Sequence, residues 1–336
     1  MNPLIPSRTR PMIAGAAAVL AAVLAQSACM VSGPGRSFDR TLKVDGPVRL
    51  DISSGSGKIV IRGGAPGVVH IHGDVRVGGF ILDGRSRRID EITENPPIEQ
   101  SGNSIRIGRR LQDPLFSWVT ISYTVETPED SEVKAKNGSG GIEVSDLKEP
   151  LTLTTGSGIL SVENAGDDLS LNVGSGGARA THVGGNINFQ CGSGRVALED
   201  VREEIRGTAG SGDIHIQQAH GRVNVHTGSG GIYVSGAVQD LRVGTGSGNV
   251  EVRGNPAPDA FWDLGTSSGR IALTVPSGAG FSLTARTASG NVQAGLPIMI
   301  EEQSRRVLRA RVGDGRAHVN LQTGSGNIRI QQGGAS

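Results

Sequence analysis

Two glutamates form the arrangement in this sequence that is nearest to acid–base chemistry. Glu163 and Glu199 stand two repeats of the chain apart, with Thr181 halfway between them. A pair of carboxylates can cleave a glycosidic bond when one donates a proton and the other acts as base or nucleophile. The repeat described below would separate these carboxylates by about 10 Å, and no aromatic platform for a sugar accompanies them. We therefore expect no enzyme, and a polysaccharide-active enzyme is the least favoured hypothesis.

Two histidines are the residues closest to a metal-binding pattern. His70 and His72 are two positions apart in an expected strand, so their side chains point to one face. Protein zinc sites use at least three ligands, and no third ligand has a recognisable spacing. Glycine-rich calcium repeats need an aspartate in every turn, yet only Asp213 directly follows a Gly-Ser-Gly turn. We expect neither a metal nor a cofactor.

Residues 1–28 have the parts of a secretion signal. Arg8 and Arg10 precede an apolar run over residues 12–25, which ends in small residues. This run is shorter than the roughly 20 residues that a membrane-spanning helix needs. We therefore expect a signal peptide over 1–28 and an exported protein.

Cys29 stands where a bacterial lipoprotein signal places its lipid-modified cysteine. Ser27 and Ala28 fit the small positions before it, although Gln26 stands where such signals prefer leucine. The alternative is ordinary cleavage after Ser27 or Ala28, which releases a soluble protein. On the lipoprotein hypothesis a lipid on Cys29 holds the chain on a membrane, Met30 favours sorting to the outer membrane, and residues 29–46 form a flexible tether.

The composition is rich in glycine and nearly neutral in charge. Of 336 residues, 52 are glycine and 15 are proline, whereas only 3% are aromatic. The formal net charge of +1 leaves no global field that would attract nucleic acid, so a nucleic-acid partner is not expected. So much glycine indicates either low complexity or a regular repeat.

A Gly-Ser-Gly turn recurs every 18 residues and shows that the repeat is regular. A fixed period of this length is typical of a solenoid. We interpret the serines as structural turn residues and expect the flanking glycines to provide positive φ angles. The turn serines, including weaker and displaced copies, are Ser56, Ser139, Ser157, Ser175, Ser193, Ser211, Ser229, Ser247, Ser268, Ser289 and Ser325.

Each repeat contains two short strands. Apolar residues stand three and five positions after each turn serine, and again six and four positions before it, with polar residues between them. A spacing of two is the period of a strand, and helical spacing is absent. Stacked units of this kind form two parallel sheets across a thin aliphatic core. The predicted fold is an all-β parallel β-solenoid with two short strands per coil, an N-terminal strand-rich cap and a C-terminal hairpin.

A column of small residues stands two positions before the turn serines. Most members are threonine, but Val173, Cys191 and Ala209 interrupt the column on three successive repeats. An ice-binding surface would need an unbroken threonine face, so we expect structural packing instead. Cys191 is interpreted as a buried member of this column, and no disulfide with Cys29 is expected.

The repeat also suggests how the chain is divided. Residues 47–333 form the solenoid domain, with regular coils over 133–253 and longer coils over 254–333. Residues 62–132 break the period and form an irregular N-terminal elaboration or cap, with strands expected at 68–72, 104–107 and 119–125. Alternating residues on both sides of Asp314-Gly315 predict a hairpin between 307–312 and 317–321.

Several of these features together resemble a known bacterial family. They are the secretion signal, the early strand pair at 48–52 and 57–61, and the segment 121–128 that leads into the Gly-Ser-Gly coils. They resemble a β-strand-repeat family of unknown function labelled as candidate adhesins, over about residues 40–333. The resemblance implies a β-solenoid in the cell envelope and provides no catalytic residues.

The expected function is therefore binding rather than catalysis. We expect a non-enzymatic, envelope-associated β-solenoid that presents polar faces for adhesion or for binding an envelope or surface protein or glycan. Its location would be that of an outer-membrane lipoprotein, or periplasmic or secreted. The alternative is a periplasmic scaffold or accessory in envelope-stress signalling. The sequence leaves the ligand and the oligomeric state open.

Overall fold

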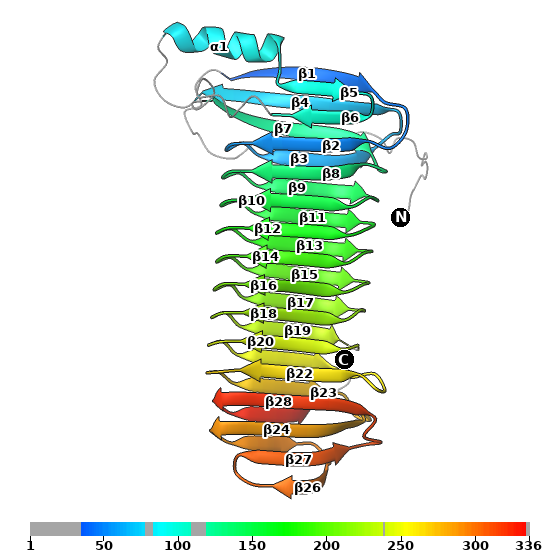
Figure 1. Ribbon diagram of the computed structural model, residues 1–336, viewed down its shortest axis with the longest axis vertical. Coiled ribbons are helices and arrows are strands. Elements are labelled where there is room, and N and C mark those ends of the chain that lie inside the picture. Colours follow the sequence, from blue (N-terminus) through cyan, green and yellow to red (C-terminus); the bar gives the residue numbers. More distant parts are fainter. Residues whose placement is uncertain (1–34, 78–82, 109–118, 238, 334–336) are drawn as a thin grey trace, which may run out of the picture. The chain divides into compact units, whose positions relative to one another are not determined.

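The computed structural model describes residues 35–77, 83–108, 119–237 and 239–333 (Figure 1). The chain divides into two compact units, Met1–Ser32 and Gly33–Ser336, and all described residues belong to the second. The expected signal peptide and Cys29 lie outside the described residues. Within the described ranges, no helix is both long and apolar enough to cross a membrane.

Two long sheets and one helix, α1 (Asp83–Glu94), make up the described chain (Figure 1). In spatial order, sheet A contains β1 (Arg36–Lys43), β4 (Val68–Val77), β7 (Val119–Pro128), β3 (Ile59–Gly64), β9 (Ile142–Leu147), β11 (Leu160–Ala165), β13 (Ala178–Val183), β15 (Val196–Val201), β17 (Ile214–Ala219), β19 (Ile232–Ala237), β21 (Val250–Gly254), β23 (Ile271–Val275), β29 (Ile328–Gln332) and β25 (Val292–Gly295). Sheet B contains β26 (Met299–Gln303), β27 (Val307–Val312), β24 (Phe281–Ser289), β28 (Ala317–Ser325), β22 (Phe261–Thr266), β20 (Leu241–Thr245), β18 (Val223–Thr227), β16 (Ile205–Ala209), β14 (Ile187–Cys191), β12 (Leu169–Val173), β10 (Leu151–Thr155), β8 (Glu132–Asn137), β2 (Arg49–Ser54), β6 (Ser104–Ile107) and β5 (Ile98–Ser101).

The regular coils confirm the predicted parallel β-solenoid. Each coil contributes one strand to each sheet, and equivalent residues of successive coils pair in parallel, as Leu151 does with Leu169 and Leu160 with Ala178. Buried and accessible residues alternate along these strands. The buried leucine, isoleucine and valine side chains form one continuous core between the sheets. The residues that the spacing of two predicted to face inward are therefore the ones that form the core.

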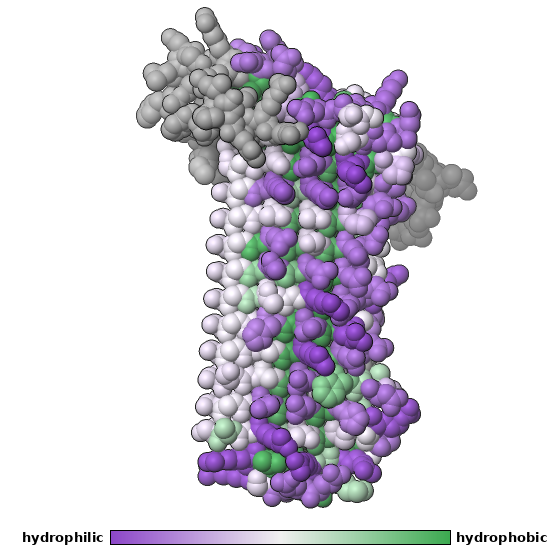
Figure 2. Space-filling model, in the orientation of Figure 1, coloured by the Kyte–Doolittle hydropathy of each residue, from purple (hydrophilic) through white to green (hydrophobic). Residues whose placement is uncertain are grey.

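The Gly-Ser-Gly turns stack as tightly as the strands do. The N–H of Ser193 donates to the carbonyl of Gly174, and the N–H of Ser211 donates to the carbonyl of Gly192. The turn serines are exposed. Figure 2 shows a near-white column down one side of the stack, as expected for turns made of glycine and serine.

The predicted reason for glycine in these turns was wrong. Among the glycines that flank the turn serines of the regular coils, none has a positive φ. A Cβ at Gly194 would instead lie 1.3 Å from the carbonyl oxygen of Gly176, and one at Gly212 would lie 1.7 Å from that of Gly194. Glycine is required because successive turns approach each other too closely for a side chain.

The threonine column lies just inside these turns and binds them to each other. Thr245 is 3% exposed, and its hydroxyl donates to the carbonyl of Gly230 at 2.8 Å. The same hydroxyl accepts from the N–H of Gly248 at 3.1 Å. Cys191 takes this position in its own coil, where it is buried and forms no disulfide bond within the described residues. The column therefore combines packing with hydrogen bonds between neighbouring coils.

The substitution Thr245→Val is expected to reduce the free energy of unfolding by about 1–3 kcal/mol, because two buried backbone groups lose a partner. Thr208→Val is the matched control, since Thr208 is exposed on the outer side of β16, and its effect should stay within about 0.5 kcal/mol. Urea denaturation of both variants measures the difference. Equal stabilities would contradict the structural role of the buried hydroxyl.

At both ends of the stack, one coil lies between two others that are not its neighbours in sequence. Near the N-terminus, β2 pairs with β6 and β8, while β3 pairs with β7 and β9. Near the C-terminus, β28 lies between β22 and β24, and β29 lies between β23 and β25. The order of coils in space therefore differs from their order in the chain at each end.

The N-terminal elaboration contains the expected strands and one helix that the sequence analysis did not predict. The expected strands at 68–72, 104–107 and 119–125 correspond to β4, β6 and β7. Helix α1 packs against β1 and β4, and Ile89 and Ile92 are buried on it. Two apolar residues three positions apart are too weak a signal to indicate a helix by periodicity. The helix ends just before Pro96 and Pro97, which disfavour helical backbone in the residues before them.

The expected C-terminal hairpin was assigned to the wrong strands. Strands β27 and β28, at 307–312 and 317–325, do not pair, because β24 lies between them. Instead β27 forms an antiparallel pair with β26. Strand β28 continues the parallel stack on β22, and its Thr323 and Ser325 occupy the positions of the threonine column and the turn serines. Parallel pairing of β28 with the stack was therefore preferred over the antiparallel pairing with β27 that the Asp314-Gly315 turn predicted.

Candidate functional site

The strands of sheet A in the regular coils end in a row of residues with left-handed backbone. The residue seven positions after each turn serine has a φ between 52° and 59° in five coils, and is Gly236 in the next. The pairing between β11 and β13 passes over this residue, because Glu163 pairs with Thr181 and Ala165 with Val183. The row is Asp146, Asn164, His182, Asp200, Gln218 and Gly236. Because each coil has such a residue at the same place, the left-handed residues stack along the edge of sheet A, and all but Asp200 are exposed.

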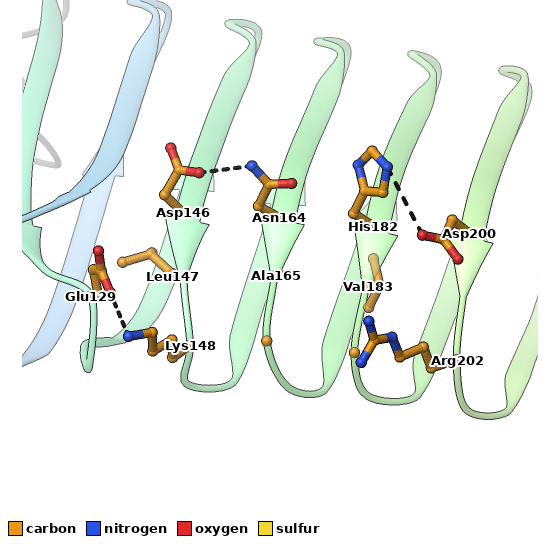
Figure 3. A pocket seen from close by; sticks show the side chains of 12 residues that line it. Glu129, Asp146, Leu147, Lys148, Asn164, Ala165, His182, Val183, Asp200 and Arg202 are labelled. Atoms are coloured by element: carbon orange, nitrogen blue, oxygen red, sulfur yellow. Dashed lines mark hydrogen bonds and ion pairs between the residues drawn. The ribbon is translucent and has the colours of Figure 1, made fainter.

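A groove of about 490 Å³ follows this row over several coils (Figure 3). We call it the edge groove; its polar lining is Glu129, Asp146, Lys148, Asn164, His182, Asp200 and Arg202. Leu147, Ala165 and Val183 contribute to its floor and are themselves buried. The edge groove is thus an open channel lined by charged and amide side chains from successive coils.

Polar groups of the edge groove are paired along the stack, as the dashed lines in Figure 3 show. Lys148 Nζ lies 2.6 Å from Glu129 Oε2, and this contact raises the pKa of the lysine. Asn164 Nδ2 donates to Asp146 Oδ1 at 2.8 Å.

Asp200 is shared between two histidines from the coils on either side. Its Oδ1 lies 3.0 Å from His220 Nε2, and its Oδ2 lies 3.9 Å from His182 Nε2. Asp200 therefore links side chains from three successive coils along this edge of the solenoid.

The two glutamates that could have acted as an acid–base pair lie on the outer face of sheet A. Glu163 pairs with Thr181, and Thr181 pairs with Glu199, so one strand separates the two carboxylates. Both glutamates are exposed. The structure therefore places them in one row but does not bring them together in the edge groove.

The histidine pair of β4 faces strand β1. His72 Nδ1 lies 2.8 Å from Asp39 Oδ1, and His70 Nδ1 lies 3.0 Å from the hydroxyl of Thr41. Within the described ranges, no group of three or more His, Cys, Asp or Glu side chains could hold a metal ion. The carboxylate of Asp213 accepts a hydrogen bond from the N–H of Gly231 at 2.8 Å, which is a structural contact between neighbouring coils.

The hydrogen bond with Asp39, with smaller contributions from the charges of Asp39 and Asp74, raises the pKa of His72 above 6.5. A raised folded-state pKa adds stability that is present below about pH 6.5 and is lost as the pH rises through the pKa of the folded protein. We expect Asp39→Asn to lower the pKa of His72 more than Asp74→Asn, since Asp74 is 3.6 Å away. NMR titration of the ring measures both values, and an equal shift in the two variants would contradict the assignment.

An aromatic pair on sheet A was missed by the sequence analysis. His215 and Tyr233, on β17 and β19, stack with ring centroids 4.6 Å apart and an interplanar angle of 23°. The ring of Tyr233 lies over Gly231, where a Cβ would be 2.9 Å from it. Burial, followed by the charge of Arg195, lowers the pKa of His215. The equal position of the two rings in successive repeats was the signal that could have predicted the pair.

Burial also raises the pKa of the Cys191 thiol, which therefore has low thiolate character.

A family model and several solved structures match this chain. Three solved structures are similar: a candidate cell adhesion protein from Clostridium sporogenes (11% identity, TM-score 0.23, covering 89% of this chain and 100% of that one), a candidate lipid-binding protein from Parabacteroides distasonis (11%, 0.36, 90% and 99%) and a candidate adhesin from Bacteroides fragilis (14%, 0.33, 88% and 97%). No curated protein matches the sequence. The model of the Toastrack DUF4097 family, a domain family of unknown function, matches residues 99–331, and the chain belongs to this family.

Proposed function

We propose that this protein is an exported, non-enzymatic β-solenoid of the cell envelope, which binds a surface or a partner through its polar lateral faces. One observation carries the proposal: equivalent polar side chains of successive coils lie in register along the stack. Such rows present the same contacts repeatedly over a long surface. They suit an extended ligand or surface better than a small substrate, which needs groups that converge on one point.

The envelope location is proposed from the sequence of residues 1–37. The basic start, the apolar run and Cys29 support export and lipid attachment, and the glycine-containing residues that follow support a flexible connection. A lipid on Cys29 would hold the solenoid close to a membrane while leaving its lateral faces accessible. A second anchoring contribution, such as another acyl chain, makes attachment more stable than one chain alone.

Fractionation of cells that produce the full chain tests the attachment. Cys29→Ala should move the protein from the membrane fraction to the soluble fraction and remove an acyl mass detected by mass spectrometry. Cys191→Ala is the matched control because it removes the only other cysteine, and it should leave both readouts unchanged. Unchanged fractionation of Cys29→Ala would overturn the lipid anchor.

Protease treatment of intact cells tests on which side of the outer membrane the solenoid lies. Loss of the protein supports adhesion, whereas protection would instead favour a periplasmic scaffold or accessory in envelope-stress signalling. The binding itself is tested by co-sedimentation of the purified unit Gly33–Ser336 with intact cells and with isolated envelope polymers. Failure to bind cells, envelope polymers and envelope proteins alike would overturn the proposed function.

A further inference from the structure

The outward face of sheet B carries no carboxylate over six successive strands, β10, β12, β14, β16, β18 and β20. Its residues stand five and three positions before each turn serine, between residues that are buried. They are amides, hydroxyls, one glycine and the basic residues Arg206, His226 and Arg242. We call this surface the sheet B face.

Sheet A differs in charge over the same coils. Its outward face carries Glu163 on β11, Glu199 on β15 and Glu251 on β21. The solenoid itself requires only that outward residues be polar, since the core is formed by the inward ones. Packing therefore does not explain why the carboxylates stand on one sheet and are absent from the other.

The sheet B face is also hollowed. A groove of about 430 Å³ crosses β12, β14, β16 and β18, and Asn172, Asn188, Gln190 and Asn224 line it. Gly207 on β16 also lines this groove, and the ring of Phe189 packs on its core side. Equivalent residues along it are paired in parallel, so they recur about every 4.8 Å.

The amides of this groove are available for a ligand. Asn164 and Asn186, elsewhere on the solenoid, are hydrogen-bonded to Asp146 and Asp168. By contrast, Asn188, Gln190 and Asn224 are exposed, and in the described part of the chain no protein group is hydrogen-bonded to their amides. Each amide can both donate and accept, which matches the hydroxyl groups of a sugar.

Resting on the proposed function, we infer that the sheet B face binds a linear, acidic polysaccharide that lies along the stack. The amide and hydroxyl rows contact the sugar hydroxyls. Arg206 and Arg242 stand in the same row as Asn188 and Asn224 and favour the acidic groups of the polymer, although Arg206 also contacts Glu204 at 2.8 Å. The absence of outward carboxylates removes the repulsion that sheet A would exert on the same polymer.

The composition of the face disfavours a protein or a lipid membrane as the ligand. Protein interfaces depend on buried aromatic or aliphatic anchors, and membrane binding needs apolar side chains that insert. The exposed large apolar residues of the described chain are Ile159, Phe261, Met299 and Ile300. Of these, Phe261 borders the face, where Arg242 lies 5.9 Å from its ring. A polar, repeating surface without such anchors therefore disfavours a protein interface.

Affinity electrophoresis of the purified unit Gly33–Ser336 tests the inference with three polymers. Alginate is a linear polymer of acidic sugars, hydroxyethylcellulose is linear and neutral, and polyglutamate is acidic without sugars. We expect alginate to be bound about tenfold more tightly than either control polymer. Equal binding of polyglutamate, or no binding of alginate, would overturn the inference.

Matched variants locate the surface. Asn188→Ala with Asn224→Ala should weaken alginate binding by about tenfold, whereas Gln217→Ala with Arg253→Ala on sheet A should change it by less than about twofold. All four residues are exposed, and melting temperatures confirm that the variants fold. Equal losses in both variants would contradict the assignment to sheet B.

The same variants distinguish this inference from the proposed function. If the unsubstituted unit binds cells and the sheet B variant binds them equally well, the solenoid is a binding protein that uses another face, and the inference is wrong. If the unsubstituted unit binds neither cells nor any envelope polymer, both are wrong.

Discussion

Replacement of Gly194 by alanine is expected to lower the free energy of unfolding by about 3 kcal/mol or more. A Cβ there would lie 1.3 Å from the carbonyl oxygen of Gly176 in the preceding coil. That oxygen belongs to backbone, and the neighbouring turn is fixed by the hydrogen bond from Ser193 N–H to Gly174. The turns would have to separate, which breaks the ladder on one side of the stack. Thermal and urea unfolding followed by circular dichroism measure the loss.

Gly265→Ala is the control for this prediction. Gly265 lies in β22, has no atom within 4 Å of a Cβ position, and its backbone is not left-handed. Alanine there should leave stability unchanged or raise it slightly, because it reduces the freedom of the unfolded chain. A Gly194→Ala protein as stable as the Gly265→Ala protein would show that the turns do not stack as closely as the structure has them.

The second large effect is expected at Phe189. Its ring is 3% exposed and fills the space left by Gly207 on the next strand, where a Cβ would be 2.3 Å from the ring. Phe189→Ala removes this ring and should cost about 3–5 kcal/mol of stability, as large-to-small substitutions in cores do. Denaturant midpoints of the variant and the unsubstituted protein measure the cost.

A double-mutant cycle tests whether the two positions share one space. Gly207→Val alone should destabilise the protein because its side chain collides with the ring. In combination with Phe189→Ala it should restore part of the stability, because valine then occupies the vacated volume. Strictly additive effects would mean that Phe189 and Gly207 are not packed against each other.

The regular coils could be predicted in detail because each repeat contains its own complete signal. Apolar residues at fixed offsets from the turn serine, such as Leu153 and Ile142, gave the inward positions, and all of them are buried. Where the chain no longer follows the 18-residue period, these apolar residues do not indicate which strands pair with each other. For this reason the pairing of β27 with β24 and β26, and the insertion of β28, could not be predicted. Several strands that are distant in sequence have the same alternation of apolar and polar residues, so the sequence pattern fits each of them as a pairing partner equally well.

The candidate site was harder to predict than the fold. Glu163 and Glu199, the residues nearest to acid–base chemistry in the sequence, stand six positions after their turn serines. The residues of the edge groove stand one position further on, where Asp146, Asn164 and His182 share left-handed backbone. Aspartate, asparagine and histidine are among the residues enriched in that conformation, so the column contained a signal. The edge groove, however, follows these left-handed residues, which alternation of apolar residues does not reveal.

The insertion of coils at both ends of the stack has a consequence for how the protein responds to pulling. In an ordinary repeat array, the last repeat contacts only one neighbour and can peel away first. Here the C-terminal strand β29 is held by β23 on one side and β25 on the other, and β28 is held likewise. Extracting either strand requires two ladders of hydrogen bonds to shear at once. A protein attached at one end and loaded along its side would thus resist fraying at the end where simple repeat arrays are weakest.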